Sequence, residues 1–161
     1  MAKPSRNSSP QSARADVRTF FITSRATAGK ARLQTDRMAS LFIDVLRSYV
    51  AMNKFTVHDF VVMPNHVHIL ITVPQRMSIE KAAQLIKGNF SYRAKRELGF
   101  QGEIWQRGFS EVRVLDRGSF LKHREYIENN PVEAGLTDSP EKYPYSSAFF
   151  RAQKAAAAKA G

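Results

Sequence analysis

Apolar residues recur along the chain with periods that distinguish strands from helices. Residues 17–23 form a short β-branched and aromatic run, which favours a strand. In residues 36–52 the apolar positions recur at steps of three and four, which predicts an amphipathic helix. The next two apolar runs, 55–63 and 66–73, are separated by a Pro-Asn pair that favours a turn, so we expect them to form adjacent antiparallel strands.

The second half of the chain continues this alternation. Ser78 is expected to cap a helix whose apolar residues recur at helical spacing as far as Phe90 and whose other side is basic. Residues 111–115 are expected to form a fourth strand. Ser119 can cap a third helix, which should end near Asn130 because the following proline disfavours helical geometry in the residue before it.

The predicted order of elements is β-α-β-β-α-β-α, and its first six elements match the ferredoxin-like motif. We therefore expect an α+β fold, with an antiparallel sheet, helices packed on one of its faces and a further C-terminal helix. With 161 residues the chain should hold one domain, over residues 16–150. Residues 1–15 are expected to be a disordered basic arm, and residues 151–161 an Ala- and Lys-rich tail that forms either a frayed helix or a disordered segment.

The amino-acid composition limits the classes of protein to which the chain can belong. Lys and Arg number 25 against 14 Asp and Glu, and the resulting net charge of +11 points to a polyanionic partner such as nucleic acid, although ribosomal and membrane-surface proteins share it. The chain has no Cys, which excludes disulfides and Cys-bound zinc and fits the cytoplasm. No apolar run approaches the roughly 18 residues that span a bilayer, so we expect a soluble protein without a membrane partner.

Two histidines in the third predicted strand could chelate a metal ion. Side chains alternate along a strand, so His66 and His68 should project from the same face, about 7 Å apart at the backbone. The intervening Val67 should face the helices. Two histidines on a half-exposed strand face can also simply form hydrogen bonds, and spacing alone leaves both interpretations open.

The third predicted helix carries a tyrosine and an amide on one face. Tyr126 and Asn130 are four residues apart, so their side chains are neighbours, and His123 lies near them. A helical Tyr is more often a packed amphipathic residue, and Asn-Asn-Pro alone indicates the end of a helix. Spacing by itself therefore does not identify a catalytic site here.

Four sequence strings carry a family resemblance over residues 17–150. They are MPNHVHIL at 63–70, EIWQRGF at 103–109, REYIENNPVEAGL at 124–136 and YPYSSAF at 143–149. In these strings and their order the sequence resembles the single-tyrosine HUH transposases, and within them the REP-associated tyrosine transposases. The resemblance implies that His66 and His68 are metal ligands, that Tyr126 is the nucleophile and that Asn130 is a third, amide-type ligand.

The same resemblance implies the chemistry and the partner. Mg²⁺ is the expected metal, with Mn²⁺ also able to serve, and Tyr126 would form a covalent 5′-phosphotyrosine while a 3′-hydroxyl is freed. The expected partner is single-stranded DNA beside hairpins, bound by a nucleoid-associated monomer rather than a homodimer. The candidates for phosphate contact and base stacking are Lys87, Trp105, Arg107 and Phe109, with core packing as the alternative for the two aromatic residues.

Two other functions remain open at this point. A non-catalytic nucleic-acid-binding module would need neither a metal nor a covalent adduct. A zinc-dependent hydrolase would attack with metal-bound water and keep its activity without Tyr126. The ligands of such a zinc site would be His58, His66, His68 and His123.

Overall fold

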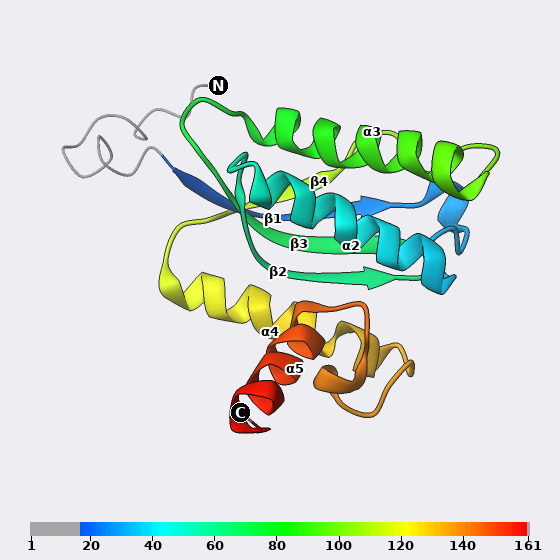
Figure 1. Ribbon diagram of the computed structural model, residues 1–161. Coiled ribbons are helices and arrows are strands. Elements are labelled where there is room, and N and C mark those ends of the chain that lie inside the picture. The colour runs from blue at the N-terminus through cyan, green and yellow to red at the C-terminus, as the bar shows by residue number, and fades with distance from the viewer. Residues whose placement is uncertain (1–16, 161) are drawn as a thin grey trace.

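The computed structural model describes residues 17–160 and contains a four-stranded antiparallel sheet with helices on both faces (Figure 1). The strands are β1 (Arg18–Arg25), β2 (Thr56–Met63), β3 (His66–Val73) and β4 (Ser110–Val114). The helices are α2 (Asp36–Ala51), α3 (Ile79–Leu98), α4 (Arg117–Glu133) and α5 (Ser147–Ala160), with short 3-10 turns η2 (Thr27–Gly29) and η3 (Pro140–Lys142). The strand order β2-β3-β1-β4 confirms the predicted α+β, ferredoxin-like arrangement.

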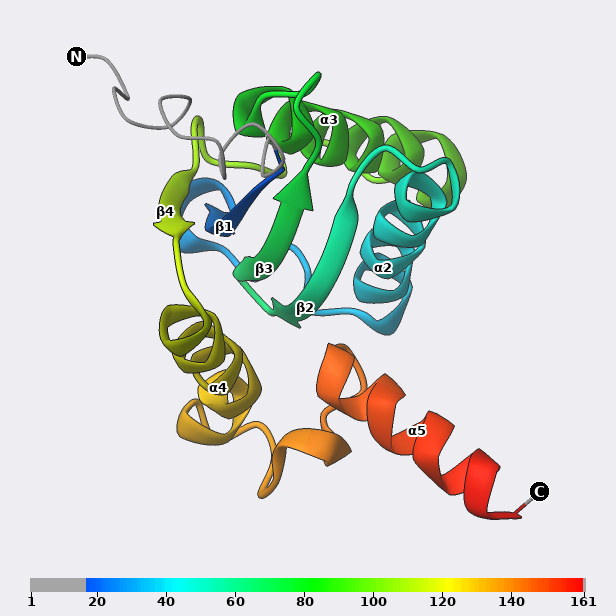
Figure 2. The same ribbon diagram turned by 90° about the vertical axis from the view of Figure 1, so that its left-hand side faces the viewer.

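Helices α2 and α3 begin and end where capping chemistry favours it. The side chain of Thr35 accepts a hydrogen bond from the backbone N–H of Met38, and Ser78 does the same for Lys81, which confirms Ser78 as a cap. Gly99 ends α3 in the left-handed conformation, at φ 69°. Both helices pack on one face of the sheet (Figure 2), and their apolar stripes form the main core with Phe42 and Phe90 at its centre.

A second, smaller core lies on the other face of the sheet, under α4. Its buried residues are Val61, Met63, Leu70, Val114, Ile127 and Tyr143. Strand β3 contributes to both faces, because Val67 points into the main core while His68 contacts α4. The histidines therefore face away from α2 and α3, as predicted, but α4 covers the side of the sheet that the sequence left open.

Helix α4 begins and ends at other residues than expected. Its cap is Asp116, whose side chain accepts a hydrogen bond from the backbone N–H of Ser119, so Ser119 is the third helical residue and not the cap. The helix also continues through Pro131 to Glu133 instead of stopping near Asn130. Pro131 lies in the last turn, where its missing N–H costs a single helical hydrogen bond and its ring is buried.

Of the two alternatives for the end of the chain, the structure shows the helix. Helix α5 begins at Ser147 and runs past residue 151 to Ala160, so residues 151–160 continue a helix that starts inside the domain. The predicted arm at residues 1–15 lies outside the described residues. Within residues 17–160, the helices lack the length and apolar character that crossing a membrane requires.

Candidate active site

Strand β3 and helix α4 bring four of the predicted site residues together. His66 and His68 lie at the start of β3 with their ring centroids 4.7 Å apart. The ring of Tyr126 lies edge-on to His68 at 5.3 Å, and Asn130 Oδ1 lies 3.2 Å from His66 Nε2. The alternation of the strand and the helical period therefore place these residues as the sequence predicted.

Each histidine is held through its Nδ1 atom. His66 Nδ1 lies 2.7 Å from Asn65 Oδ1, and His68 Nδ1 lies 2.8 Å from the hydroxyl of Thr23 on β1. These contacts fix the orientation of both rings and leave the Nε2 atoms for other partners. Sequence reasoning missed Thr23 and Asn65. Thr23 becomes visible through strand register, which pairs it with His68, whereas Asn65 stands directly beside the histidine pair.

The two Nε2 atoms differ in their partners, since His66 Nε2 contacts Asn130 and His68 Nε2 has no hydrogen-bond partner within residues 17–160. A neutral imidazole carries one N–H, so His66 can donate to Asn65 or to Asn130 but leaves a lone pair facing an oxygen at the other nitrogen. His68 Nε2 is buried and has no hydrogen-bond partner among the described residues. The unpartnered Nε2 of His68 costs free energy as it stands, and a cation beside the two Nε2 atoms and the amide oxygen would relieve it.

Burial keeps both rings in the form that binds metals. It lowers the pKa of His68 to about 3, with smaller contributions from the neighbouring His66 and Arg25. Burial also lowers the pKa of His66, against a raising effect of its hydrogen bond with Asn130. Neutral imidazoles ligate metals and protonated ones do not. The donor set of two imidazole nitrogens and one amide oxygen thus fits a divalent cation of the Mn²⁺ or Mg²⁺ type.

The ring of Tyr126 packs against neighbouring aromatic rings on one side, and the rest of the side chain is exposed. Its side chain is 50% exposed, and its ring stands edge-on to both His68 and Phe21, at 84° to the latter. Phe21 also contacts the ring of His123, whose Nδ1 lies 2.8 Å from the backbone oxygen of Ser119. His123 therefore helps to pack the helix, while the exposed phenol can be reached by a large substrate.

The four histidines of the alternative zinc site do not assemble. His58 hydrogen-bonds to the hydroxyl of Thr72 at 2.6 Å and packs edge-on against Phe120, away from His66. Across residues 17–160 no three His, Cys, Asp or Glu side chains form a group that could hold a metal ion. The structure thus removes the ligand set on which the zinc hydrolase depended.

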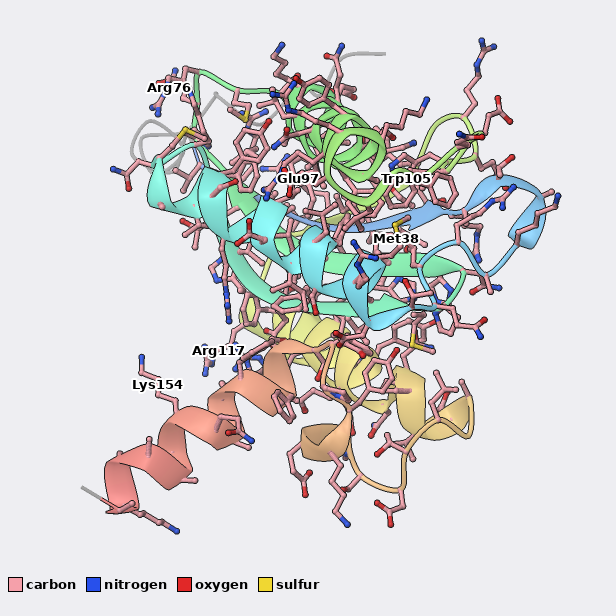
Figure 3. All side chains as sticks on the ribbon, turned by 45° about the vertical axis from the view of Figure 1, so that its right-hand side comes forward. Met38, Arg76, Glu97, Trp105, Arg117 and Lys154 are labelled. Carbon is pink, nitrogen blue, oxygen red and sulfur yellow. The ribbon has the colours of Figure 1, made fainter. Side chains whose placement is uncertain are left out.

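The residues expected to contact DNA lie in and around the loop between α3 and β4. Trp105 packs against Phe42 and Phe90 in the main core, and it lies between α3 and the sheet (Figure 3). Its indole N–H donates to the backbone oxygen of Lys87, and the Lys87 ammonium donates to the backbone oxygens of Gln106 and Gly108. Trp105 and Lys87 thus brace this loop.

The other two candidates in this loop differ in exposure. Phe109 packs against the main core, and Arg107 is exposed. The loop lies near the histidines, because Gln106 donates a backbone hydrogen bond to Arg25, the strand partner of His66. DNA contact by these residues stays a prediction, and Arg107 offers the most accessible charge for it.

Comparisons with known proteins match this chain to transposases. The family model described as transposase IS200 like matches residues 24–130, a span that includes both histidines, Tyr126 and Asn130. The REP-associated tyrosine transposase of Escherichia coli K12 is 26% identical over 133 residues, which cover 80% of this chain and 75% of that protein. A REP-associated tyrosine transposase candidate from Haemophilus influenzae is 27% identical over 137 residues, covering 74% of this chain and 77% of that protein.

Two solved structures of transposases resemble the structure of this chain. A REP-associated tyrosine transposase bound to a REP hairpin superimposes with a TM-score of 0.63 at 25% identity, covering 81% of this chain and 76% of that one. A transposase candidate from Deinococcus radiodurans shares the fold, with a TM-score of 0.52 at 20% identity over 69% of this chain and 88% of that one. The resemblance carried by the four sequence strings is confirmed. Because the family model matches residues 24–130, which include the histidine pair and Tyr126, the chain belongs to the IS200-like transposase family.

Proposed function

We propose that this protein is a single-stranded DNA endonuclease and strand transferase that acts beside REP-like hairpins through a covalent bond to Tyr126. The observation that carries the proposal is the convergence of an exposed phenol, two neutral imidazoles and an amide oxygen. The solved relative that is bound to a REP hairpin supports DNA of this kind as the partner. The net charge of +11 fits a polyanionic substrate.

His66, His68 and Asn130 would hold a divalent cation, Mg²⁺ or Mn²⁺. Bound there, the cation supplies positive charge that offsets the negative charge developing on the phosphate oxygens. Burial keeps the rings of His66 and His68 neutral, and contacts with Asn65 and Thr23 orient them for metal binding. Asn130 contributes from α4, so the metal site and the nucleophile are set by the same helix.

The nucleophile acts from a fixed position. Phe21 and His68 hold the ring of Tyr126 edge-on, which limits its motion, while half of its side chain stays exposed. The phenolic oxygen of Tyr126 attacks the phosphorus in line and its proton passes to solvent. The bond from phosphorus to the 3′-oxygen of the neighbouring nucleotide breaks, and that oxygen takes up a proton from solvent. A 5′-phosphotyrosine and a free 3′-hydroxyl result. Attack by a 3′-hydroxyl on the phosphotyrosine restores a phosphodiester and releases Tyr126.

The test is adduct formation with labelled single-stranded DNA that carries a REP-like hairpin from the organism's own genome. In the presence of Mg²⁺ or Mn²⁺ we expect a protein-linked band on a denaturing gel. The band should disappear with chelator and in Tyr126→Phe, but it should persist in Tyr92→Phe, which alters an exposed tyrosine on α3. Cleavage that survives Tyr126→Phe would assign the attack to water, and binding without cleavage would indicate a non-catalytic module.

A further inference from the structure

A buried carboxylate on β2 lies outside the chemistry described so far. The side chain of Asp59 is fully buried. Its Oδ2 accepts from Arg124 Nε of α4 at 2.7 Å, and its Oδ1 accepts from Arg151 Nη1 of α5 at 2.8 Å and from the hydroxyl of Ser147 at 3.0 Å. One carboxylate on the edge strand β2 thus joins the sheet to both C-terminal helices.

A β-bulge lies next to this carboxylate and turns His58 toward α4 as well. The pairing of β2 with β3 steps from Val57 opposite Ile71 to Asp59 opposite Leu70, which leaves His58 as an extra residue. Val57 packs against the main core, whereas His58 packs against Phe120 of α4 and Asp59 reaches Arg124. Without the extra residue, strict alternation would put Val57 on the same face as Asp59 and turn His58 away from α4.

Helix α4 depends on such polar contacts because little of it is buried. Its buried residues are Ile127 and Pro131, whereas α2 buries eight. Phe120 and His123 are only partly buried, so apolar packing determines the rotation of α4 about its own axis less firmly than that of α2. Polar contacts on its flanks can set that rotation. Among them is the ion pair of Arg124 with Asp59, whose side chain is fully buried.

The rotation of α4 decides where the nucleophile points. Arg124 and Tyr126 are two residues apart, so at about 100° per residue they project from nearly opposite flanks of the helix. Arg124 is drawn toward β2 by Asp59, and Tyr126 then faces His68 on β3. Arg151 adds a second connection, since it also pairs with Glu128 of α4 at 2.7 Å.

We propose that Asp59 is a positioning residue for the Tyr126 nucleophile: its ion pairs with Arg124 and Arg151 set the rotation of α4 and hence the placement of the phenol beside His68. The side chain of Asp59 contacts Arg124, Arg151 and Ser147, none of which is a candidate metal ligand. This role rests on the proposed function of Tyr126, but the arrangement of α4 can be measured independently of catalysis.

The kinetic test replaces Arg124 instead of Asp59. Because Arg124 is partly exposed and Asp59 is fully buried, replacing Arg124 disturbs the core less. In Arg124→Gln, single-turnover adduct formation should slow by about 10- to 100-fold, as expected for a displaced nucleophile, with hairpin affinity unchanged. Arg124→Lys should restore part of the rate because it keeps the charge. Lys122→Gln, an exposed cation on the same helix, is the matched control and should behave like the wild type.

The structural test exploits the absence of Cys from the chain. Spin labels on cysteines at the exposed positions Leu121 of α4 and Met52 after α2 report the placement of α4 by electron paramagnetic resonance. The distance distribution should shift or broaden in Arg124→Gln and stay unchanged in Lys122→Gln. An unchanged distribution in Arg124→Gln, or a displaced helix with an undiminished adduct rate, would overturn the proposal.

The two hypotheses fail in different ways. If the wild type formed no adduct on any hairpin, the proposed function would fall, and the spin-label distances would still decide whether Asp59 and Arg124 position α4. If the wild type formed the adduct and Arg124→Gln lost hairpin affinity instead of rate, Arg124 would be a DNA-binding residue and the positioning role would be wrong.

Discussion

His68 combines a titratable ring with almost complete burial, and this has a measurable cost. Burial lowers its pKa from 6.5 to about 3 in the folded protein. Below pH 6.5 the unfolded chain takes up a proton that the folded site refuses, so stability falls as the pH drops from 6.5 toward 3. At pH 5 this one ring should cost about 2 kcal/mol relative to pH 7.

The measurement is urea unfolding with chelator present, at pH 7 and pH 5, for the wild type and His68→Gln. The loss of unfolding free energy between the two pH values should be smaller in His68→Gln by about 2 kcal/mol, because glutamine does not titrate there. Equal losses in the two proteins would mean that His68 is protonated in the folded state.

Asn130 offers a residue-level test of the metal site. Its amide oxygen lies 3.2 Å from His66 Nε2. Asn130→Ala removes an oxygen donor and should weaken Mn²⁺ binding about tenfold or more, equivalent to about 1.4 kcal/mol, as measured by calorimetry. Asn130→Asp keeps an oxygen in the same place and should retain binding. Equal affinities for all three proteins would remove Asn130 from the ligand set.

The sequence predicts the direction of a side chain where that direction follows from the local period of a strand or helix. It does not predict contacts that depend on pairing between distant segments. Alternation along β3 placed His66 and His68 on one face, and the helical period placed Asn130 beside Tyr126. The contact between Thr23 and His68 requires the register of β1 against β3, which no local pattern encodes. The partners of Asp59 were missed for the same reason, since they lie 65 and more residues away.

At the scale of elements, the start of α4 shows which of two plausible caps acts. Asp116 accepts the backbone hydrogen bond from Ser119 at 2.8 Å, whereas the Ser119 hydroxyl lies 3.4 Å from His123 Nδ1. Asp116→Ala should therefore destabilise the protein by about 1 kcal/mol and speed amide exchange in the first turn of α4. Ser119→Ala should cost less than about 0.5 kcal/mol. The reverse ranking in urea unfolding would restore Ser119 as the cap.

The course of α4 also shows how tertiary structure overrides a local preference. A proline disfavours helical geometry in the residue before it, and on that preference alone Asn130 should end the helix. Instead Pro131 is buried, and the chain leaves the helix through Gly135, at φ 76°, after backbone hydrogen bonds from Ala134 and Leu136 have completed the last turn. Packing of Pro131 thus keeps Asn130 inside the helix.

At the scale of the whole molecule, the C-terminal segment completes a sheet that the ferredoxin-like motif leaves open. Tyr145 accepts a backbone hydrogen bond from Val62, and Ser147 accepts one from Phe60, so the chain covers the free edge of β2 before α5 begins. These residues belong to the string at 143–149 that carries the family resemblance, but the sequence predicted no strand contact for them. Their role follows from a return of the chain across the molecule, which periodicity cannot predict.

Two truncations separate the structural part of α5 from the rest. Deleting residues 147–161 removes Ser147 and Arg151 from Asp59 and should lower the free energy of unfolding by about 2 kcal/mol, with slower adduct formation. Deleting residues 155–161 removes exposed Ala-rich turns beyond Lys154, where α5 projects away from the domain (Figure 3), and should change stability by less than about 0.5 kcal/mol. Equal effects of the two deletions, in urea unfolding and in the adduct assay, would show that the first turn of α5 does not hold α4 in place.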